Sequence, residues 1–180
     1  MAKYSLLGLS GSLRKDSANT KLLIEAARLF DAHDFRLANL NLPLYDGDLE
    51  SREGIPEAVQ SLADSISSAD AVLISTPEYN KAPSGVLKNA LDWISRTKSK
   101  PWSDKPLAVM SASAGRSGGE RSQMVLRGFM VTFRPAILQG PEIHLADCNN
   151  QFDENGRLIG EIYIRELTAL MQRLHLEIER

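Results

Sequence analysis

The sequence predicts an α/β fold, a three-layer sandwich in which helices cover both faces of a five-stranded parallel sheet. Short apolar runs alternate with segments of helical periodicity, and this alternation is typical of parallel sheets. The strand expected after the first helix is polar enough to lie at an edge, which favours the strand order 2-1-3-4-5. A length of 180 residues with 43% hydrophobic content and no visible linker predicts a single domain over residues 1–180.

Five segments are predicted to be strands. The first, Lys3 to Leu9, and the third, Ala69 to Ser75, are nearly all apolar and should be buried on both faces. The second, Phe35 to Leu40, alternates imperfectly and suits an edge position. The last two are expected at Leu107 to Met110 and at Pro135 to Leu138.

Five helices are predicted from apolar side chains at helical spacing. The first ends near Ala32, the second follows Gly54 with Pro56 in its first turn, and the third has Ser84 as its N-cap. The last two are expected at about 120–132 and 160–178. The inward face of the fourth helix is expected to hold Met124, Val125, Gly128 and Phe129.

Composition argues against several classes of function. A net charge of −2 argues against a nucleic-acid binder, which usually carries a basic surplus. The single cysteine, Cys148, excludes an internal disulfide and fits the reducing cytoplasm, where we expect the protein to act. The N-terminal apolar run is too short to span a membrane. No metal motif is present and the histidines at 33, 144 and 175 lie far apart, so no metal is expected.

Three loops rich in glycine, proline and hydroxyl groups follow the first, third and fourth predicted strands. They span Ser10–Asn19, Thr76–Pro83 and Ser111–Gly119. In an open parallel sheet of order 2-1-3-4-5 the chain reverses its winding between strands one and three, and ligands bind at that switch point beyond the carboxyl ends of the strands. The three loops are therefore expected to form one binding site.

The first loop predicts a site for a phosphate group. It leads into a helix, whose N-terminus offers unpaired N–H groups and a positive dipole end, and Arg14 can contact two phosphate oxygens at once. The alternative is that Ser17 or Asn19 only caps the helix while Arg14 lies in solvent. Neither a G-x-G-x-x-G nor a Walker-type motif is present, so a monophosphate beside a flat slot is favoured over a dinucleotide or a triphosphate.

Three stretches carry a resemblance to a known family. They are LSGSLR at 9–14 with Ser17 and Asn19 behind it, TPEYN at 76–80, and GVLKNALDW at 85–93. Together they resemble the NADPH-dependent FMN reductase family, flavodoxin-like proteins that include flavin, quinone, azo-dye and chromate reductases. The match covers about residues 3–123. The chain departs from the family pattern at two places. Immediately before the glycine of the third helix the family commonly has proline, whereas this chain has Ser84 there and Pro83 one residue earlier. Lys81 replaces a residue that is often small.

The resemblance implies an FMN site built from twelve residues. The cofactor phosphate and its surroundings would be held by Ser10, Ser12, Arg14, Ser17, Asn19 and Thr20. The edge of the flavin ring would meet Pro77, Glu78, Tyr79 and Asn80, and the third loop would complete the pocket with Ser113 and Gly115. Two alternatives stay open: Tyr79 could be an exposed loop aromatic, and Glu78 could contribute only its backbone, its carboxylate facing solvent or Lys81.

The implied reaction is hydride transfer from NAD(P)H through FMN to a quinone-like, azo, metal-oxyanion or free-flavin acceptor. No catalytic side chain is assigned, because the cofactor supplies the difficult chemistry. The alternative is a flavodoxin-like electron carrier, although carriers tend to be strongly acidic and a charge of −2 is mild. The family also implies a homodimer or homotetramer, and Trp93 on the third helix is expected either in the core or at a subunit interface.

Overall fold

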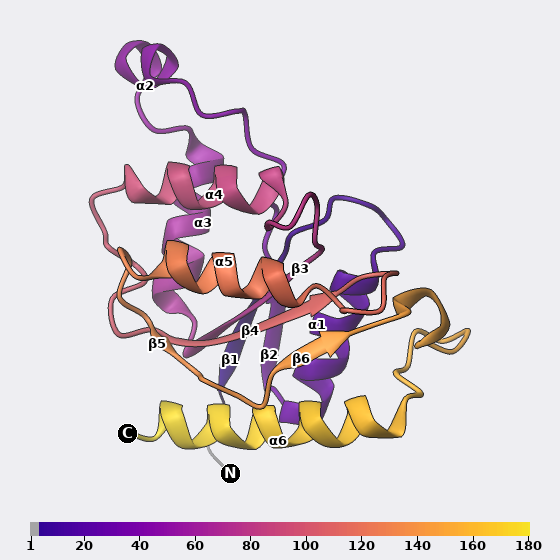
Figure 1. The fold of residues 1–180 in the computed structure, drawn as a ribbon. Helices are drawn as coiled ribbons and strands as arrows, with labels where there is room; N and C mark the ends of the chain where they lie inside the picture. Colours follow the sequence, from indigo (N-terminus) through magenta and orange to yellow (C-terminus); the bar gives the residue numbers. More distant parts are fainter. Residues whose placement is uncertain (1–3) are drawn as a thin grey trace.

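The protein, described here for residues 4–180 by a computed structural model, has one parallel sheet between two layers of helices (Figure 1). The strands run in the order β2-β1-β3-β4-β5, with β6 also beside β4, so the predicted order is confirmed and a sixth strand is added. Their bounds are β1 Ser5–Ser10, β2 Asp34–Leu37, β3 Ala71–Thr76, β4 Pro106–Ala112, β5 Ala136–Ile137 and β6 Ile143–Leu145. Lys3, at which the first strand was expected to begin, lies outside the described residues.

The helices include the five that periodicity predicts. Their bounds are α1 Ala18–Phe30, α2 Gly47–Glu53, α3 Glu57–Ser68, α4 Gly85–Ser95, α5 Glu120–Met130 and α6 Glu161–Ile178, with a short 3-10 turn at Cys148–Asn150. Ser84 caps α4 as predicted, because its Oγ accepts the Leu87 N–H at 3.3 Å. Pro56 lies at the N-cap of α3 and not within its first turn. Within residues 4–180, none of these helices combines the length and hydropathy that crossing a bilayer requires.

Alternating side chains along the central strands build two hydrophobic cores, one on each face of the sheet. Leu73 of β3 packs with α1 and α6, whereas Val72 and Ile74 pack with α3, α4 and α5 (Figure 1). All six residues of β3 are buried, which explains its unbroken apolar run. By contrast, β2 pairs with β1 and has no buried residue, as expected of an edge strand.

Helix α5 turns a different face to the core from the one that its apolar residues predict. Its buried residues are Ser122, Gln123, Leu126 and Met130, whereas Met124 is 66% exposed. The cause is hydrogen bonding: Gln123 Nε2 donates to Ser111 Oγ at 2.8 Å and to the Ile143 carbonyl at 2.7 Å. The predicted face is therefore wrong, because polar side chains with bonding partners take core positions on this helix.

Strand β6 was not expected from the sequence. It pairs with β4 at Met110–Ala112, whereas β5 pairs with β4 at Pro106–Leu107. Two short strands thus share one position beside β4. With three residues, β6 is too short to show a periodicity of its own.

Helix α2 lies partly within the stretch expected to be a loop, and it projects from the rest of the molecule (Figure 1). None of its residues is buried. It is held through Glu50, whose carboxylate accepts Arg96 Nε at 2.9 Å and the Tyr45 hydroxyl at 3.0 Å. The hydrogen bond from Arg96 lowers the pKa of Glu50, so the carboxylate stays ionised to a lower pH than an unpaired glutamate would.

Trp93 belongs to the core and not to a subunit interface. Its side chain is fully buried, its ring meets Tyr45 edge-on at 5.0 Å, and its Nε1 donates to the Pro43 carbonyl at 2.8 Å. Of the two places expected for Trp93, the core is confirmed.

Glu25 of α1 is a carboxylate with 1% exposure that accepts hydrogen bonds from three residues. It accepts Arg28 Nη2 at 3.0 Å, Arg157 Nη1 at 2.9 Å and the Leu158 N–H at 3.3 Å. Burial acts to raise the pKa of Glu25, but these hydrogen bonds outweigh it and the pKa lies below its ordinary value of 4.5. The polar turn before α6 is thereby tied to α1.

Replacing Glu25 by Gln is expected to lower the free energy of unfolding by about 2 kcal/mol at pH 7, because charge-assisted bonds at a buried acceptor are lost. Since the pKa of Glu25 is lower in the folded state, this stabilisation is complete above the pKa of the unfolded chain and is lost as pH falls through the folded pKa. Urea unfolding at pH 7 and at acid pH measures the change. Glu53→Gln, in an exposed pair with Arg52, is the matched control, and equal losses in both variants would contradict the prediction.

Candidate functional site

The carboxyl ends of β1, β3 and β4 are neighbours at one edge of the sheet, and each continues into one of the three loops. The Gly11 N–H donates to the Ser75 carbonyl at 2.8 Å, so the first loop starts against β3. A Cβ on Gly11 would lie 2.7 Å from Thr76 Oγ1, and only glycine permits this close approach. The structure therefore brings the first and second loops into contact at the switch point, as the topology predicts.

Asn19, in the first turn of α1, links this helix to two strands. Its Nδ2 donates to the Ala112 carbonyl at 3.0 Å, and its Oδ1 accepts the Ala112 N–H at 3.0 Å and Ser75 Oγ at 2.8 Å. The residue is 4% exposed. The amide thus fixes the N-terminus of α1 against the ends of β3 and β4, and its polar atoms are used within the protein.

The first loop combines internal bracing with exposed donors. Ser10 Oγ and Thr20 Oγ1 lie 2.8 Å apart, and Ser17 caps α1 by accepting the Thr20 N–H at 3.4 Å. Ser12 is half-buried, and Arg14 is exposed and forms no ion pair within residues 4–180. The remaining first-turn N–H groups of α1 and the free guanidinium give this loop the chemistry of an anion site.

The second loop doubles back in a tight turn. Tyr79 and Ala82 exchange backbone hydrogen bonds of 3.0 and 3.1 Å, and Asn80 and Lys81 between them have φ of +51° and +66°. Two successive positive φ angles are the geometry of a type I′ turn. Tyr79 is 55% exposed, so its ring is presented to solvent at the base of this turn. Pro77, by contrast, is buried at the start of the loop.

Glu78 joins the second loop to the helix that follows the third. Its Oε2 accepts the backbone N–H groups of Arg121 and Ser122 at 3.1 and 3.3 Å. A carboxylate is favoured at a helix N-terminus, where it satisfies unpaired donors and the dipole. The carboxylate therefore caps α5, and the backbone of Glu78 is the part left to meet a ligand.

The third loop is anchored on the segment around β6. The Ser113 N–H donates to the Leu145 carbonyl at 3.0 Å, and the Cys148 N–H donates to the Ser113 carbonyl at 3.2 Å. Gly115 is exposed, and a Cβ there would meet one neighbouring atom, Ser113 Oγ at 3.9 Å, so its backbone is open to approach. Burial raises the pKa of the Cys148 thiol, which is the opposite of what an activated nucleophile needs.

Comparison with known proteins shows the family of this chain. The model of the NADPH-dependent FMN reductase family matches residues 4–149. Over 177 residues the chain is 41% identical to the NAD(P)H-dependent FMN reductase of Pseudomonas aeruginosa, covering 97% of this chain and 95% of that protein. This chain belongs to the NADPH-dependent FMN reductase family. It is also 35% identical to the quinone reductase of Escherichia coli K12, covering 93% and 91% of the two chains.

The architecture of this FMN reductase also agrees with a solved relative. The flavoenzyme NAD(P)H:(acceptor) oxidoreductase FerB from Paracoccus denitrificans superposes with a TM-score of 0.87 at 32% identity, covering 98% of this chain and 97% of that one. The expected flavodoxin-like fold is confirmed. Family membership likewise confirms an oxidoreductase with FMN as its cofactor and NAD(P)H as its co-substrate.

The loops of the reductase have the donors and the openings that FMN needs. A phosphate needs clustered N–H donors and a cation, which the N-terminus of α1 and Arg14 provide. A flat ring needs backbone free of side chains, and Gly115 offers it. Within residues 4–180, no three His, Cys, Asp or Glu side chains gather in a way that could hold a metal ion.

Sequence interpretation missed the hydroxyl side chains that lie side by side at the carboxyl ends of β1, β3 and β4. The strand register pairs Ser10 with Ser75 and Thr76 with Ser111. Ser75 and Ser111 are fully buried and bond to Asn19 and Gln123, which bring helices α1 and α5 onto the sheet. A signal existed, because the apolar runs of β1, β3 and β4 all lead into serine or threonine.

Replacing Asn19 by Ala is expected to lower the free energy of unfolding by about 2–4 kcal/mol, because two backbone groups and one hydroxyl lose their buried partner. FMN affinity should fall as well, since the N-terminus of α1 is released. Urea unfolding and FMN titration measure both effects. The control is Asn155→Ala in an exposed turn, and an Asn19→Ala protein as stable as this control would refute the bridging role.

Proposed function

We propose that this reductase binds FMN across its three loops and uses it to transfer electrons from NAD(P)H to a quinone. The observation that carries the proposal is the convergence of the loops at the switch point. The first loop contacts the second at Gly11, and Glu78 of the second loop accepts a hydrogen bond from the first turn of α5. The similarity to the quinone reductase of Escherichia coli supports quinones as the acceptor class.

The FMN phosphate would lie at the N-terminus of α1. The exposed Arg14 and the half-buried Ser12 hydroxyl would bind it, together with the first N–H groups of the helix. Ser10, Thr20 and Asn19 would act by positioning, since their polar atoms are engaged within the protein. Ser17 would do both, capping the helix while lining the anion site.

The ring of FMN would lie between the second and third loops. Backbone groups from Pro77 to Asn80 would meet its polar edge, and the tight turn holds them in one conformation. Tyr79 would cover the ring, while Ser113 and Gly115 would approach it from the other loop. The hydrogen bond of Glu78 to α5 would set the distance between the second and third loops.

Transfer of hydride between NAD(P)H and an acceptor is the chemistry that bound FMN supplies. The protein's part is to orient the reactants and to hold the loops in place. None of the proposed contacts requires a side chain to act as an acid or a base.

Three further expectations accompany this function. We propose that the chain acts in the cytoplasm as one FMN-binding domain that forms a homodimer or homotetramer. The single cysteine supports a reducing compartment. The exposed apolar side chains of Met124 and Val131 on and after α5, at 66% and 74% exposure, support burial against a second copy.

The activity is tested by loading the purified chain with FMN, removing unbound flavin and adding NADPH or NADH with benzoquinone. Continuous oxidation of the nicotinamide that depends on both FMN and quinone is the expected result. Free FMN without protein is the control. Bound flavin without steady oxidation in the absence of a separate reductase would favour the electron carrier, and a chain that retains no flavin would overturn the proposal.

Replacing Arg14 by Ala is expected to weaken FMN binding roughly 10- to 150-fold, or about 1.5–3 kcal/mol, because a charge-assisted bond to the phosphate is lost. Lys15→Ala is the matched control, since Lys15 is an exposed cation of the same loop to which the proposal assigns no contact with FMN. Quenching of FMN fluorescence measures both affinities. Unchanged affinity in the Arg14 variant, or equal losses in the two, would remove Arg14 from the phosphate site.

A further inference from the structure

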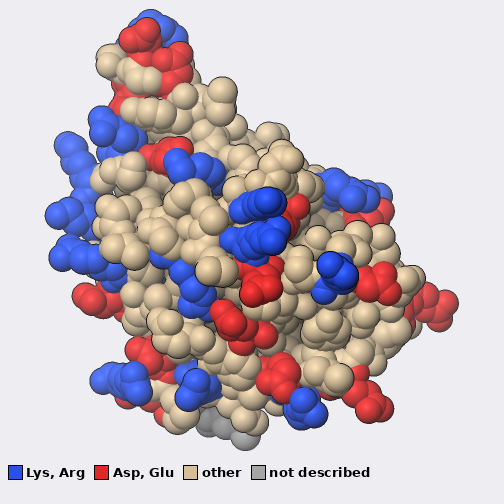
Figure 2. Space-filling view, viewed as in Figure 1, with Lys and Arg blue, Asp and Glu red and all other residues tan. Residues whose placement is uncertain are grey.

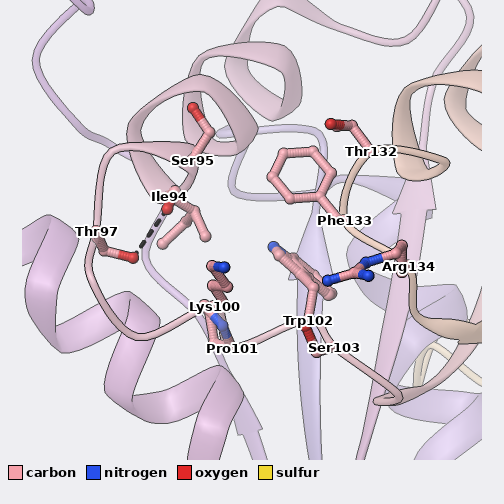
Figure 3. A pocket seen from close by; sticks show the side chains of 10 residues that line it. All are labelled: Ile94, Ser95, Thr97, Lys100, Pro101, Trp102, Ser103, Thr132, Phe133 and Arg134. Atoms are coloured by element: carbon pink, nitrogen blue, oxygen red, sulfur yellow. Dashed lines mark hydrogen bonds between the residues drawn. The ribbon is translucent and has the colours of Figure 1, made fainter.

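A separate cavity of about 290 Å³ lies at the other end of the sheet from the three loops. It is formed by segment 94–103, which precedes β4, and by segment 132–134, which precedes β5 (Figure 3). The loops of the flavin site follow the carboxyl end of β4, so the length of that strand, about 20 Å, separates the two places. The cavity thus needs an explanation of its own.

Trp102 gives the cavity an unused hydrogen-bond donor. The residue is 1% exposed, and its indole Nε1 is buried without a partner within the described chain. The indole nitrogen lies on the side of the ring that faces Ile94 and Lys100 (Figure 3). Buried indole N–H groups normally find an acceptor, as that of Trp93 does at the Pro43 carbonyl. An acceptor atom entering the cavity would satisfy Trp102.

Two cations line the same cavity. Segment 96–105 contains four lysine and arginine residues against one aspartate, and basic side chains gather on that side of the molecule (Figure 2). Arg96 is paired with a carboxylate of α2, and Lys105 Nζ donates to the carbonyls of Ser67 and Ala69 at the C-terminal end of α3. Lys100 and Arg134 form no ion pair within residues 4–180, and both line the cavity. Their charge favours an anionic group there.

The rest of the cavity wall is apolar, and a backbone hydrogen bond joins the two segments that form it. Phe133 and Trp102 pack with their ring centroids 6.3 Å apart, and Pro101 and Ile94 are buried beside them. The Asp104 N–H donates to the carbonyl of Arg134 at 3.0 Å, which joins the two segments. The site is therefore formed before any ligand enters, with an apolar wall next to its cations.

We propose that this cavity binds a single-ring aromatic carboxylate. The carboxylate would lie between Lys100 and Arg134 and accept the Trp102 indole N–H, while the ring packs on Phe133 and Pro101. A volume near 300 Å³ is at the small end of ligand sites and suits one ring. An inorganic anion would leave the apolar wall without contacts, and a neutral ring would leave both cations without a partner.

Benzoate titrated into the 15N-labelled, FMN-loaded chain tests the proposal by NMR. The sequence has two tryptophans, so two indole N–H signals report directly. The Trp102 signal should shift saturably, whereas the Trp93 signal, whose donor is bonded to Pro43, should stay in place. Benzamide, the neutral isostere, should bind at least about tenfold more weakly, since it lacks the charge that Lys100 and Arg134 recognise.

Variants of the two cations make the test specific. Lys100→Gln and Arg134→Gln should each weaken benzoate binding roughly 3- to 10-fold, and the double variant should abolish it, with FMN binding unchanged as evidence of an intact fold. Lys98→Gln, an exposed cation of the same segment outside the lining, is the control. No saturable shift of Trp102 up to about 10 mM benzoate, equal binding of benzamide, or equal effects of inorganic phosphate would overturn the proposal.

Discussion

The site depends first on one side chain, the amide of Asn19. It offers a donor and an acceptor from the same planar group, which is what the N–H and C=O of Ala112 require together. An aspartate would lack the donor, and an apolar residue would leave both backbone groups buried and unsatisfied. Because Asn19 is in the first turn of α1, this bond also determines where the helix begins relative to β3 and β4. The N-terminus of α1, where the FMN phosphate is proposed to bind, is therefore positioned by the core.

The same edge of the sheet carries three helix N-termini, yet they are not equivalent. A carboxylate, Glu78, already occupies the N-terminus of α5 and balances its dipole. The N-termini of α1 and α4 are capped by neutral serines, Ser17 and Ser84. The loop before α1 carries Arg14 and the loop before α4 carries Lys81, but only the arginine can contact two phosphate oxygens at once. Glu78 would repel a phosphate at α5, which supports the proposed placement of the FMN phosphate at α1.

Much of this could be predicted because it follows from local periodicity and sheet topology. The burial of β3 on both faces appears as an apolar run, and the order of the strands brings the three loops together. What escaped prediction depends on partners distant in sequence. Glu78 bonds to N–H groups more than 40 residues away, and Gln123 is buried because Ser111 and Ile143 lie beside it. No pattern within one segment reveals such contacts.

The parallel architecture also explains why the other end of the molecule is basic. Helices α4 and α5 end there, at Ser95 and Met130, and cations are favoured near helix C-termini. The basic character of this end therefore does not by itself require a ligand. The helix ends do not account for Trp102. Carbonyl groups at a helix C-terminus could accept its indole N–H, yet this buried donor has no acceptor within the described residues. The case for a ligand in that cavity therefore rests on the indole more than on the charges around it.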